Sequence, residues 1–291
     1  MIRRPRRSLS ILALALATLG SIGGGSATFA ASAQESQARL DRDLRAGRPV
    51  VVHLVVALCD NLHQGIVPVP KAIGNGQDPR SNLYWGARFG VRTFLAREGG
   101  WKVLPGSLAQ GGAVLERVVF FARLRRGATT VPVYLVADAW DGAEMRGAIE
   151  TFLGYASGTR REEVSFRDGA ETVRLAAGGS AHLVAFVGHN GLMDFQLAKL
   201  IPRAAQAPAN SSLVLACASK PYFHRALQAA GSHPLLLTTG LMAPEAYTLD
   251  AALKTWIGNG SVAQVRETAA QAYQKYQKCG LRAARNLFWG E

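Results

Sequence analysis

The sequence predicts an α/β fold in which a mainly parallel sheet carries helices on both faces. The first observation is a nearly continuous apolar run over residues 50–58, rich in β-branched side chains and typical of a strand buried on both faces. The second is the alternation of further apolar runs with segments of helical periodicity, at the spacing of strand–helix–strand units. Strands are expected at residues 50–58, 115–124, 131–137, 181–187, 212–216 and 234–239, and helices at residues 83–97, 143–155, 195–201, 222–230, 245–257 and 261–278.

The sequence also predicts the turns between these elements and the ends of two helices. Arg125-Arg126-Gly127 predicts a tight turn between the second and third strands, with a parallel arrangement of the two as the alternative. Weak alternation over residues 162–175 predicts a small hairpin. Asp141 is expected to cap the helix that starts near residue 143, and Gly280 is expected to terminate the last helix.

The first 33 residues have the order of segments found in a secretory signal peptide. Four arginines between residues 3 and 7 precede an apolar run from Leu9 to Leu19, and Ala31-Ser32-Ala33 supplies a small-residue cleavage site. The run is too short to span a bilayer, so an uncleaved anchor is the weaker alternative. We therefore expect an exported protein, located in the periplasm or outside the cell. The pair Arg6-Arg7 leaves open the choice between the general secretory and the twin-arginine export routes.

The mature chain is expected to be 258 residues long and to have no transmembrane segment, since no second long apolar run exists. We interpret residues 34–48 as a linker (or a short leading helix), 49–259 as one α/β domain, and 260–291 as a C-terminal helix and tail. The signal peptide takes four of the 33 basic residues and none of the 20 acidic ones, which leaves a net charge of +9. That charge suits anionic envelope surfaces. Nucleic acid is not an expected partner, because no basic stripe with interleaved aromatic residues is present. The oligomeric state is left open.

The expected chemistry lies where the parallel strands end, because ligands in open α/β sheets collect beyond the carboxyl ends of the strands. His189 follows one expected strand and Cys217 follows the next, so both side chains can reach one crevice. The imidazole can take the thiol proton or stabilise the thiolate, which would act as the nucleophile. Gly191 and the backbone amide of Cys217 are the candidate donors to an oxyanion.

At these positions the sequence resembles the caspase–legumain clan of cysteine peptidases. That clan places His-Gly after one apolar strand and Ala-Cys after the next, and the corresponding segments here are AHLVAFVGHNG and SSLVLACAS. The later segment PLLLTTGLMAPEAY is similar to the legumain-like branch. The resemblance implies a three-layer sandwich with a caspase-like sheet, His189 as general base or ion-pair partner, and Cys217 as nucleophile. It also implies a peptide or amide substrate, cleaved through a thioester without a metal or cofactor.

Departures from the clan pattern favour a different function. Asn190 stands between the histidine and the glycine, Ser219 stands where a glycine is common, and Cys217 follows His189 by only 28 positions. The alternative is a catalytically inactive envelope protein that keeps the fold and binds a ligand or partner through the 60–82 loop.

The 60–82 loop is too long and too rich in hydrogen-bonding side chains to be a simple connection. We expect it to contact the peptide or protein substrate, and a solvated loop is the alternative. The candidate substrate-binding residues are Asp60, Asn61, Gln64 and Arg80 from this loop and Asp138 from the end of the third strand.

The three cysteines are too few for a disulfide-stapled scaffold. A Cys59–Cys217 bridge would require neighbouring strands, and the expected order places the histidine strand between them. No Cys-x-x-Cys or His-x-x-x-His spacing supports a zinc site, so no metal is expected. His53 and His182 lie inside expected strands and are interpreted as structural.

Overall fold

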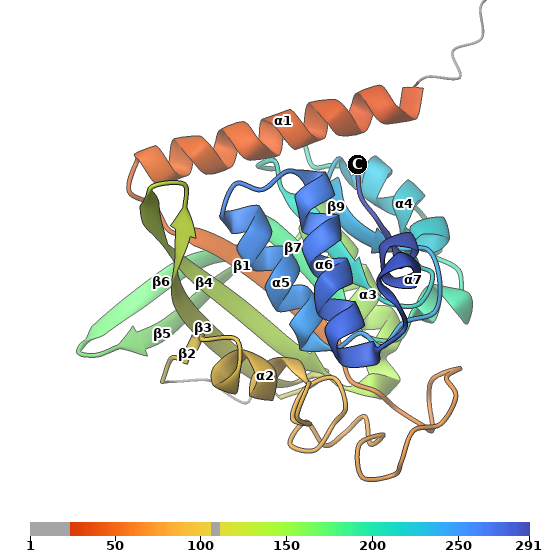
Figure 1. Ribbon diagram of the computed structural model, residues 1–291. Helices are drawn as coiled ribbons and strands as arrows, with labels where there is room; N and C mark the ends of the chain where they lie inside the picture. Colours follow the sequence, from red (N-terminus) through yellow and green to blue (C-terminus); the bar gives the residue numbers. More distant parts are fainter. Residues whose placement is uncertain (1–23, 106–110) are drawn as a thin grey trace, which may run out of the picture.

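The computed structural model describes residues 24–105 and 111–291, so most of the expected signal peptide lies outside the described residues. An eight-stranded mixed sheet organises the described chain (Figure 1). The strands β9, β8, β7, β1 and β4 pair in parallel, and β10, β3 and β2 pair antiparallel with their neighbours. This confirms the predicted α/β class with a mainly parallel sheet. In spatial order the strands are β10 (Phe288–Trp289), β9 (His233–Thr238), β8 (Ser211–Leu215), β7 (Leu183–Val187), β1 (Val50–Ala57), β4 (Thr129–Trp140), β3 (Val114–Arg126) and β2 (Lys102–Val103).

Strand β1 lies in the middle of the sheet, and all eight of its residues are buried. Its side chains alternate between two apolar clusters, with Val52 and Leu54 in one and Val51 and Val55 in the other. The alternation follows from the two-residue period of a strand, and a strand packed on both faces needs apolar residues at every position. This is why the strand is visible in the sequence as an uninterrupted run.

Helices pack on both faces of the sheet. One apolar cluster joins the sheet to α3 (Met145–Ser157) and α4 (Ser219–Ala230), and the other joins it to α5 (Ala246–Ile257) and α6 (Val262–Gln277). Figure 1 shows α5 and α6 side by side in front of the strands and α3 behind them. The remaining short helices are α2 (Val91–Arg97), α7 (Leu281–Leu287) and the 3-10 turns η1 (Gly142–Glu144) and η2 (Gly191–Met193).

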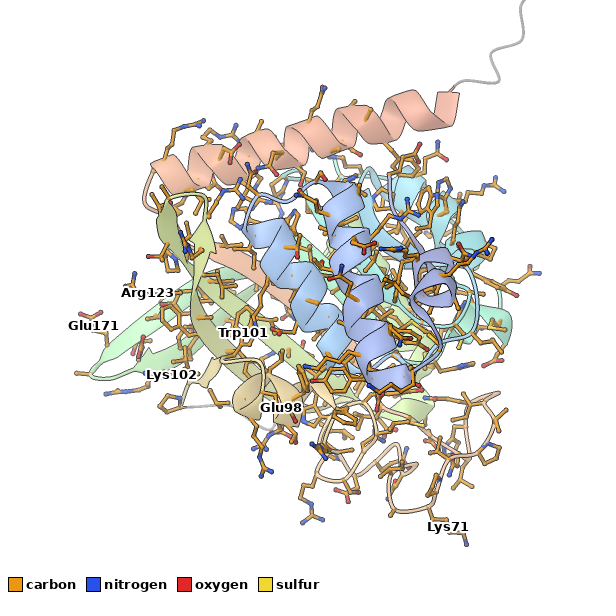
Figure 2. The ribbon with its side chains drawn as sticks, in the orientation of Figure 1. Lys71, Glu98, Trp101, Lys102, Arg123 and Glu171 are labelled. Atoms are coloured by element: carbon orange, nitrogen blue, oxygen red, sulfur yellow. The ribbon has the colours of Figure 1, made fainter. Side chains whose placement is uncertain are left out.

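Both predicted hairpin connections are present. β3 and β4 pair antiparallel through a tight turn in which Gly127 has a φ of +60°. β5 (Arg161–Asp168) and β6 (Glu171–Gly178) form a separate two-stranded sheet, and Figure 2 shows Glu171 at its outer tip. The predicted cap is also found, since the Asp141 carboxylate accepts from the Ala143 amide at 2.9 Å.

One predicted helix is shorter than expected, and another is absent. Within 83–97 only α2 is helical, because the chain before it turns too tightly: a Cβ at Gly86 would lie 2.0 Å from the Arg80 carbonyl oxygen. Residues 195–201 form no helix. The Arg146 guanidinium stacks over the Phe195 ring at 4.0 Å and donates to the Gln196 carbonyl at 3.2 Å, which holds this segment as a loop.

Of the two alternatives for residues 34–48, a linker or a leading helix, the structure has the helix. Helix α1 (Gly24–Arg45) runs across the amino ends of the parallel strands (Figure 1). Ser36 Oγ lies 3.0 Å from Ser211 Oγ at the start of β8, and Leu40 is buried. The polar composition that suggests a linker is therefore the exposed side of a docked helix. The expected cleavage site after residue 33 lies within α1.

Arg39 is the main polar contact of α1. Its guanidinium donates to the carbonyls of Ser180, Ala181 and Ala209 at 2.6 to 2.8 Å. Replacing Arg39 by methionine should lower the free energy of unfolding by about 1–3 kcal/mol, because partly buried carbonyls lose their donors. Urea denaturation measures the change. Arg42→Met, at an exposed position of the same helix, should change stability by less than about 0.5 kcal/mol, and equal losses in the two variants would contradict this role for Arg39.

The C-terminal residues belong to the domain rather than to a tail. The predicted last helix is confirmed as α6, which starts at a capping box between Ser261 and Gln264 and ends at Lys278, whose φ is +55°. Beyond Gly280, α7 leads into β10, which pairs with the outer side of β9. In the part of the chain that the structure describes, no helix combines the length and the apolar character needed to cross a membrane.

Candidate functional site

The loops that follow β7 and β8 meet at the carboxyl edge of the sheet. His189 follows β7 and Cys217 follows β8, and these two strands are neighbours. β7 also lies between β1 and β8, as expected, so Cys59 and Cys217 follow strands that are not neighbours. All three cysteines are free. The topology therefore places an imidazole and a thiol on adjacent strand ends, with no disulfide consuming the thiol.

His189 is oriented by an acidic residue that the sequence analysis missed. Its Nε2 lies 2.6 Å from Asp194 Oδ2, and the same carboxylate oxygen accepts from the Gly65 amide at 3.3 Å. Because the ionised carboxylate only accepts, Nε2 carries the proton and Nδ1 of the neutral ring has a free lone pair. Within residues 24–105 and 111–291, Nδ1 makes no hydrogen bond. An acid shortly after a histidine, beyond an Asn-Gly turn, is the sequence signal that could have revealed Asp194.

Cys217 is partly exposed at the end of β8. Its Sγ lies 3.3 Å from the Met242 amide nitrogen and 3.4 Å from the Met242 carbonyl oxygen. The next residue, Ala218, has a φ of +47°, a left-handed conformation that costs a non-glycine residue about 1 kcal/mol or more. This sharp turn between β8 and α4 places the thiol at the carboxyl edge of the sheet. No hydrogen bond joins Cys217 to His189 among the described residues.

Asn190 links the two loops. Its side chain is fully buried, donates from Nδ2 to the Cys217 carbonyl at 2.7 Å and accepts from the Leu192 amide at 3.2 Å. The residue that departs from the clan pattern therefore fixes the cysteine loop against the histidine loop.

Gly191 does not have the role expected from the sequence. Its amide donates to the His189 carbonyl at 3.1 Å, so it is not free to bind an oxyanion. A Cβ at this position would lie 2.4 Å from Met145 Cγ, which means that close packing on α3 requires the glycine. The Cys217 amide remains a candidate oxyanion donor.

Cys59 is unsuited to act as a nucleophile. It is fully buried behind the end of β1, and burial raises its thiol pKa to about 11, outweighing a hydrogen bond with Tyr84 that lowers it. A thiol in this state stays protonated near neutral pH and reacts slowly. Cys217 is therefore the reactive candidate among the two cysteines that follow strands.

The Asp60 carboxylate supports the 60–82 loop instead of facing a ligand. It is 1% exposed and accepts from the Leu62 amide, His63 Nδ1 and Gln77 Nε2 at 2.8 to 2.9 Å. Burial alone would raise the pKa of Asp60, but hydrogen bonds from Gln77 and His63 outweigh it and hold the pKa below its usual value. Asp60 is thus an ionised structural anchor.

Two further candidate substrate-binding side chains also bond the protein's own backbone. Asn61 exchanges hydrogen bonds with the Val69 backbone at 2.7 and 2.9 Å. Gln64 donates to the carbonyls of Leu58 and Gly142 at 2.7 and 3.0 Å. Arg80 is different, since its side chain is 89% exposed and, among the described residues, bonds only Asp78. Figure 2 shows Lys71, another basic residue of the loop, at the outer margin of the molecule.

Asp138 does not lie at the strand end. It sits inside β4, 1% exposed, and forms a bidentate ion pair with Arg117 of β3 at 2.5 and 2.6 Å. His53 Nε2 of β1 approaches the same carboxylate at 3.0 Å. The candidate role in substrate binding is wrong because β4 continues to Trp140 and its neighbours occupy both carboxylate oxygens.

The same cluster has the residue types of a metal site. Ligand atoms of His53, Asp138 and Glu162 lie within 4.8 Å of one another. However, the Arg117 guanidinium bonds both carboxylates, with Glu162 at 2.7 Å, and His53 Nδ1 accepts from the Gly178 amide at 2.8 Å. Because a fixed cation already compensates the charge, we assign these residues to a structural cluster.

Comparisons with protein-family models, with curated proteins and with solved structures found no match for this chain.

Proposed function

We propose that the protein is a cysteine hydrolase that cleaves a peptide or amide bond, with Cys217 as nucleophile, His189 as general base and Asp194 as the residue that orients His189. The observation that carries the proposal is the His189–Asp194 hydrogen bond of 2.6 Å. It leaves Nδ1 as the proton-accepting nitrogen, in the loop next to the one that bears a partly exposed thiol. The Asp194 carboxylate also stabilises the imidazolium once it forms.

The proposed chemistry needs no other group. His189 Nδ1 takes the proton of Cys217, and the thiolate attacks the substrate carbonyl while the Cys217 amide donates to the oxyanion. The imidazolium returns the proton to the leaving nitrogen as its bond to carbon breaks, which gives a thioester and a free amine. Water, deprotonated by His189, then attacks the thioester and Cys217 departs as the thiol.

The fold supports the same proposal. Helices on both faces of a parallel sheet are consistent with a three-layer, caspase-like sandwich, and the proposed residues follow neighbouring strands as in that clan. We also propose that the enzyme is exported, which rests on its N-terminal sequence.

The test is the rate at which iodoacetamide alkylates Cys217 near pH 6. The exposed Cys279 is replaced by serine so that one accessible thiol is followed by mass spectrometry. In this background Cys217 should react readily, and His189→Ala should slow it about tenfold or more because the base is lost. Asp194→Asn should give an intermediate rate.

The control is His63→Ala, which removes a half-exposed histidine of the 60–82 loop that lies outside the proposed dyad. It should leave the alkylation rate unchanged. A Cys217 that reacts slowly at this pH, or at the same rate in the presence and absence of His189, would refute the dyad.

The second candidate function is ligand or partner binding without catalysis. It is favoured by the contacts of Cys217 Sγ with the Met242 backbone instead of His189. Leu62 and Val67 of the 60–82 loop are 85% and 89% exposed, as at a contact surface. Hydrogen bonds between catalytic groups often form fully only with substrate present, so the Met242 contacts are compatible with both candidate functions. An inert Cys217 would leave the binding function.

A further inference from the structure

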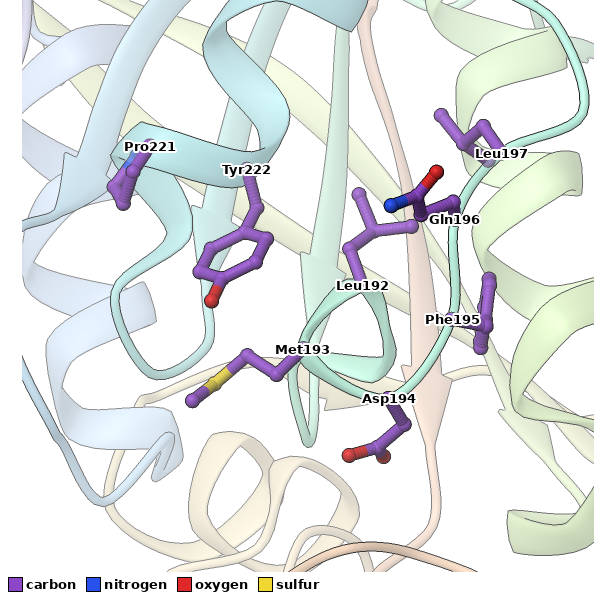
Figure 3. Close-up of a pocket in the computed structure, with 8 residues that line it drawn as sticks. All are labelled: Leu192, Met193, Asp194, Phe195, Gln196, Leu197, Pro221 and Tyr222. Carbon is purple, nitrogen blue, oxygen red and sulfur yellow. The ribbon is translucent and has the colours of Figure 1, made fainter.

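A cavity of about 470 Å³ opens between the loop that follows β7 and the start of α4 (Figure 3). One wall is the loop that follows His189, residues 192–197. The other is the first turn of α4, which begins two residues after Cys217 and contributes Pro221 and Tyr222. Asp194 belongs both to this wall and to the hydrogen bond with His189 Nε2, so the cavity adjoins the imidazole.

The large side chains of the cavity are mainly apolar. Met193 and Tyr222 are 44% and 40% exposed, unusually open for such residues, and Figure 3 shows the Tyr222 ring directed from α4 toward Met193. Leu192, Phe195 and Leu197 add further apolar atoms to the lining, and Asp194 and Gln196 add polar atoms. Covering these surfaces with an apolar group would be favourable, which makes a large apolar side chain the fitting occupant.

The wall is held in place before any ligand arrives. Arg146 of α3 stacks on Phe195 and donates to the Gln196 carbonyl at 3.2 Å. The amides of Asp194 and Phe195 donate to the Gly191 carbonyl at 2.9 and 3.0 Å. A preformed wall lowers the entropy lost on binding.

The direction of proton transfer in acyl transfer indicates which half of the substrate this cavity would bind. The imidazolium must deliver its proton to the leaving nitrogen, so the leaving half of the substrate lies on the His189 side of the thiol. We propose that the cavity binds a large apolar side chain on the leaving-group half, carried by the residue whose nitrogen departs. This inference rests on the proposed function.

The assignment can be tested without a known substrate by measuring how an acyl-enzyme divides between reaction with an amine and hydrolysis. The Cys279→Ser protein is treated with p-nitrophenyl acetate to form acetyl-Cys217, and leucinamide, phenylalaninamide or glycinamide is added. The amine nitrogen attacks the thioester carbonyl, the carbon–nitrogen bond forms as the carbon–sulfur bond breaks, and the amine proton passes through His189 to the departing sulfur. The N-acetyl amide and acetate are quantified, with Cys217→Ala as the blank.

Leucinamide and phenylalaninamide should give an amide-to-acetate ratio about tenfold or more above that of glycinamide, the discrimination expected when an apolar side chain is buried. Tyr222→Ala should remove most of this preference. Arg225→Ala changes an exposed residue of the same helix outside the cavity and should retain it.

Each outcome decides a separate point. An acetyl-enzyme that reacts equally with all three amides, or a preference that survives Tyr222→Ala, overturns the cavity assignment and leaves the hydrolase proposal standing. Failure to form acetyl-Cys217 overturns the hydrolase proposal and, with it, the leaving-group role.

Discussion

Replacing Arg117 by methionine is expected to lower the free energy of unfolding by about 3–5 kcal/mol. The Arg117 guanidinium, 12% exposed, is the cation bound to Asp138, which is 1% exposed, and it also pairs with Glu162. Burial would raise the pKa of Asp138, but the hydrogen bond and charge of Arg117 hold it below its usual value. Without Arg117 the carboxylate would be buried with His53 as its remaining partner, or would have to take up a proton. Urea unfolding at neutral pH measures the loss.

Two further variants isolate the cause of this loss. Arg123→Met removes an exposed arginine from the same strand (Figure 2) and should change stability by less than about 0.5 kcal/mol. Combining Arg117→Met with Asp138→Asn should recover part of the loss, because the neutral amide removes the unpaired charge. A double variant as unstable as the sum of the two single variants would show that the ion pair is not the cause.

Stability is also expected to decrease as the pH falls from about 6.5 to about 4, because His182 resists protonation in the folded protein. Burial, together with the charge of Arg39, lowers the His182 pKa from 6.5 to about 4, although Asp43 opposes the shift. His182 Nδ1 accepts from the Val51 amide at 3.0 Å, so a proton there would place two donors face to face. Between these two pH values the unfolded chain binds a proton that the folded chain does not, so folding is disfavoured progressively, by up to about 3 kcal/mol.

Urea unfolding across this pH range tests the assignment. His182→Gln cannot titrate, so its stability should vary less with pH than that of the wild type. A residual slope is expected from His233, whose pKa burial also lowers. Asp43 has a lowered pKa despite its burial, because Arg48 and His182 bond it, and its contribution is lost only at pH values below its ordinary pKa. Identical pH profiles for His182→Gln and the wild type would refute the assignment.

The buried strands could be predicted from the sequence because their burial leaves a one-dimensional signal. β1 is apolar at nearly every position, and β7, β8 and β9 were expected within two residues of their observed bounds. The expected position of β7 between β1 and β8 is also observed. By contrast, residues 195–201 include apolar side chains but form no helix, because Arg146 stacks on Phe195 and donates to the Gln196 carbonyl. Such contacts between distant residues leave no periodicity.

The position of the site could be predicted from the sequence, but its hydrogen bonds could not. His189 and Cys217 stand at strand ends, which sequence order alone can indicate. The orienting role of Asp194 depends on how the η2 turn folds back, and the occupied amide of Gly191 depends on packing against Met145. Residues of the 60–82 loop such as Asn61 were expected to bind substrate because they are polar. In the structure Asn61 instead forms hydrogen bonds with the Val69 backbone, and the polarity of a side chain does not distinguish these two roles.

The last residues of the chain have a consequence for self-association. β10 pairs with β9 at Leu237 and Thr238, and beyond it the Glu291 carbonyl accepts from His233 at the other end of β9. The backbone edge of β9 is therefore covered by its own chain. An uncovered strand of this kind would offer a template on which a second molecule could add a strand and begin aggregation. The C-terminal segment thus replaces the six-residue edge of β9 by the two-residue strand β10, which offers a shorter template on this side of the sheet.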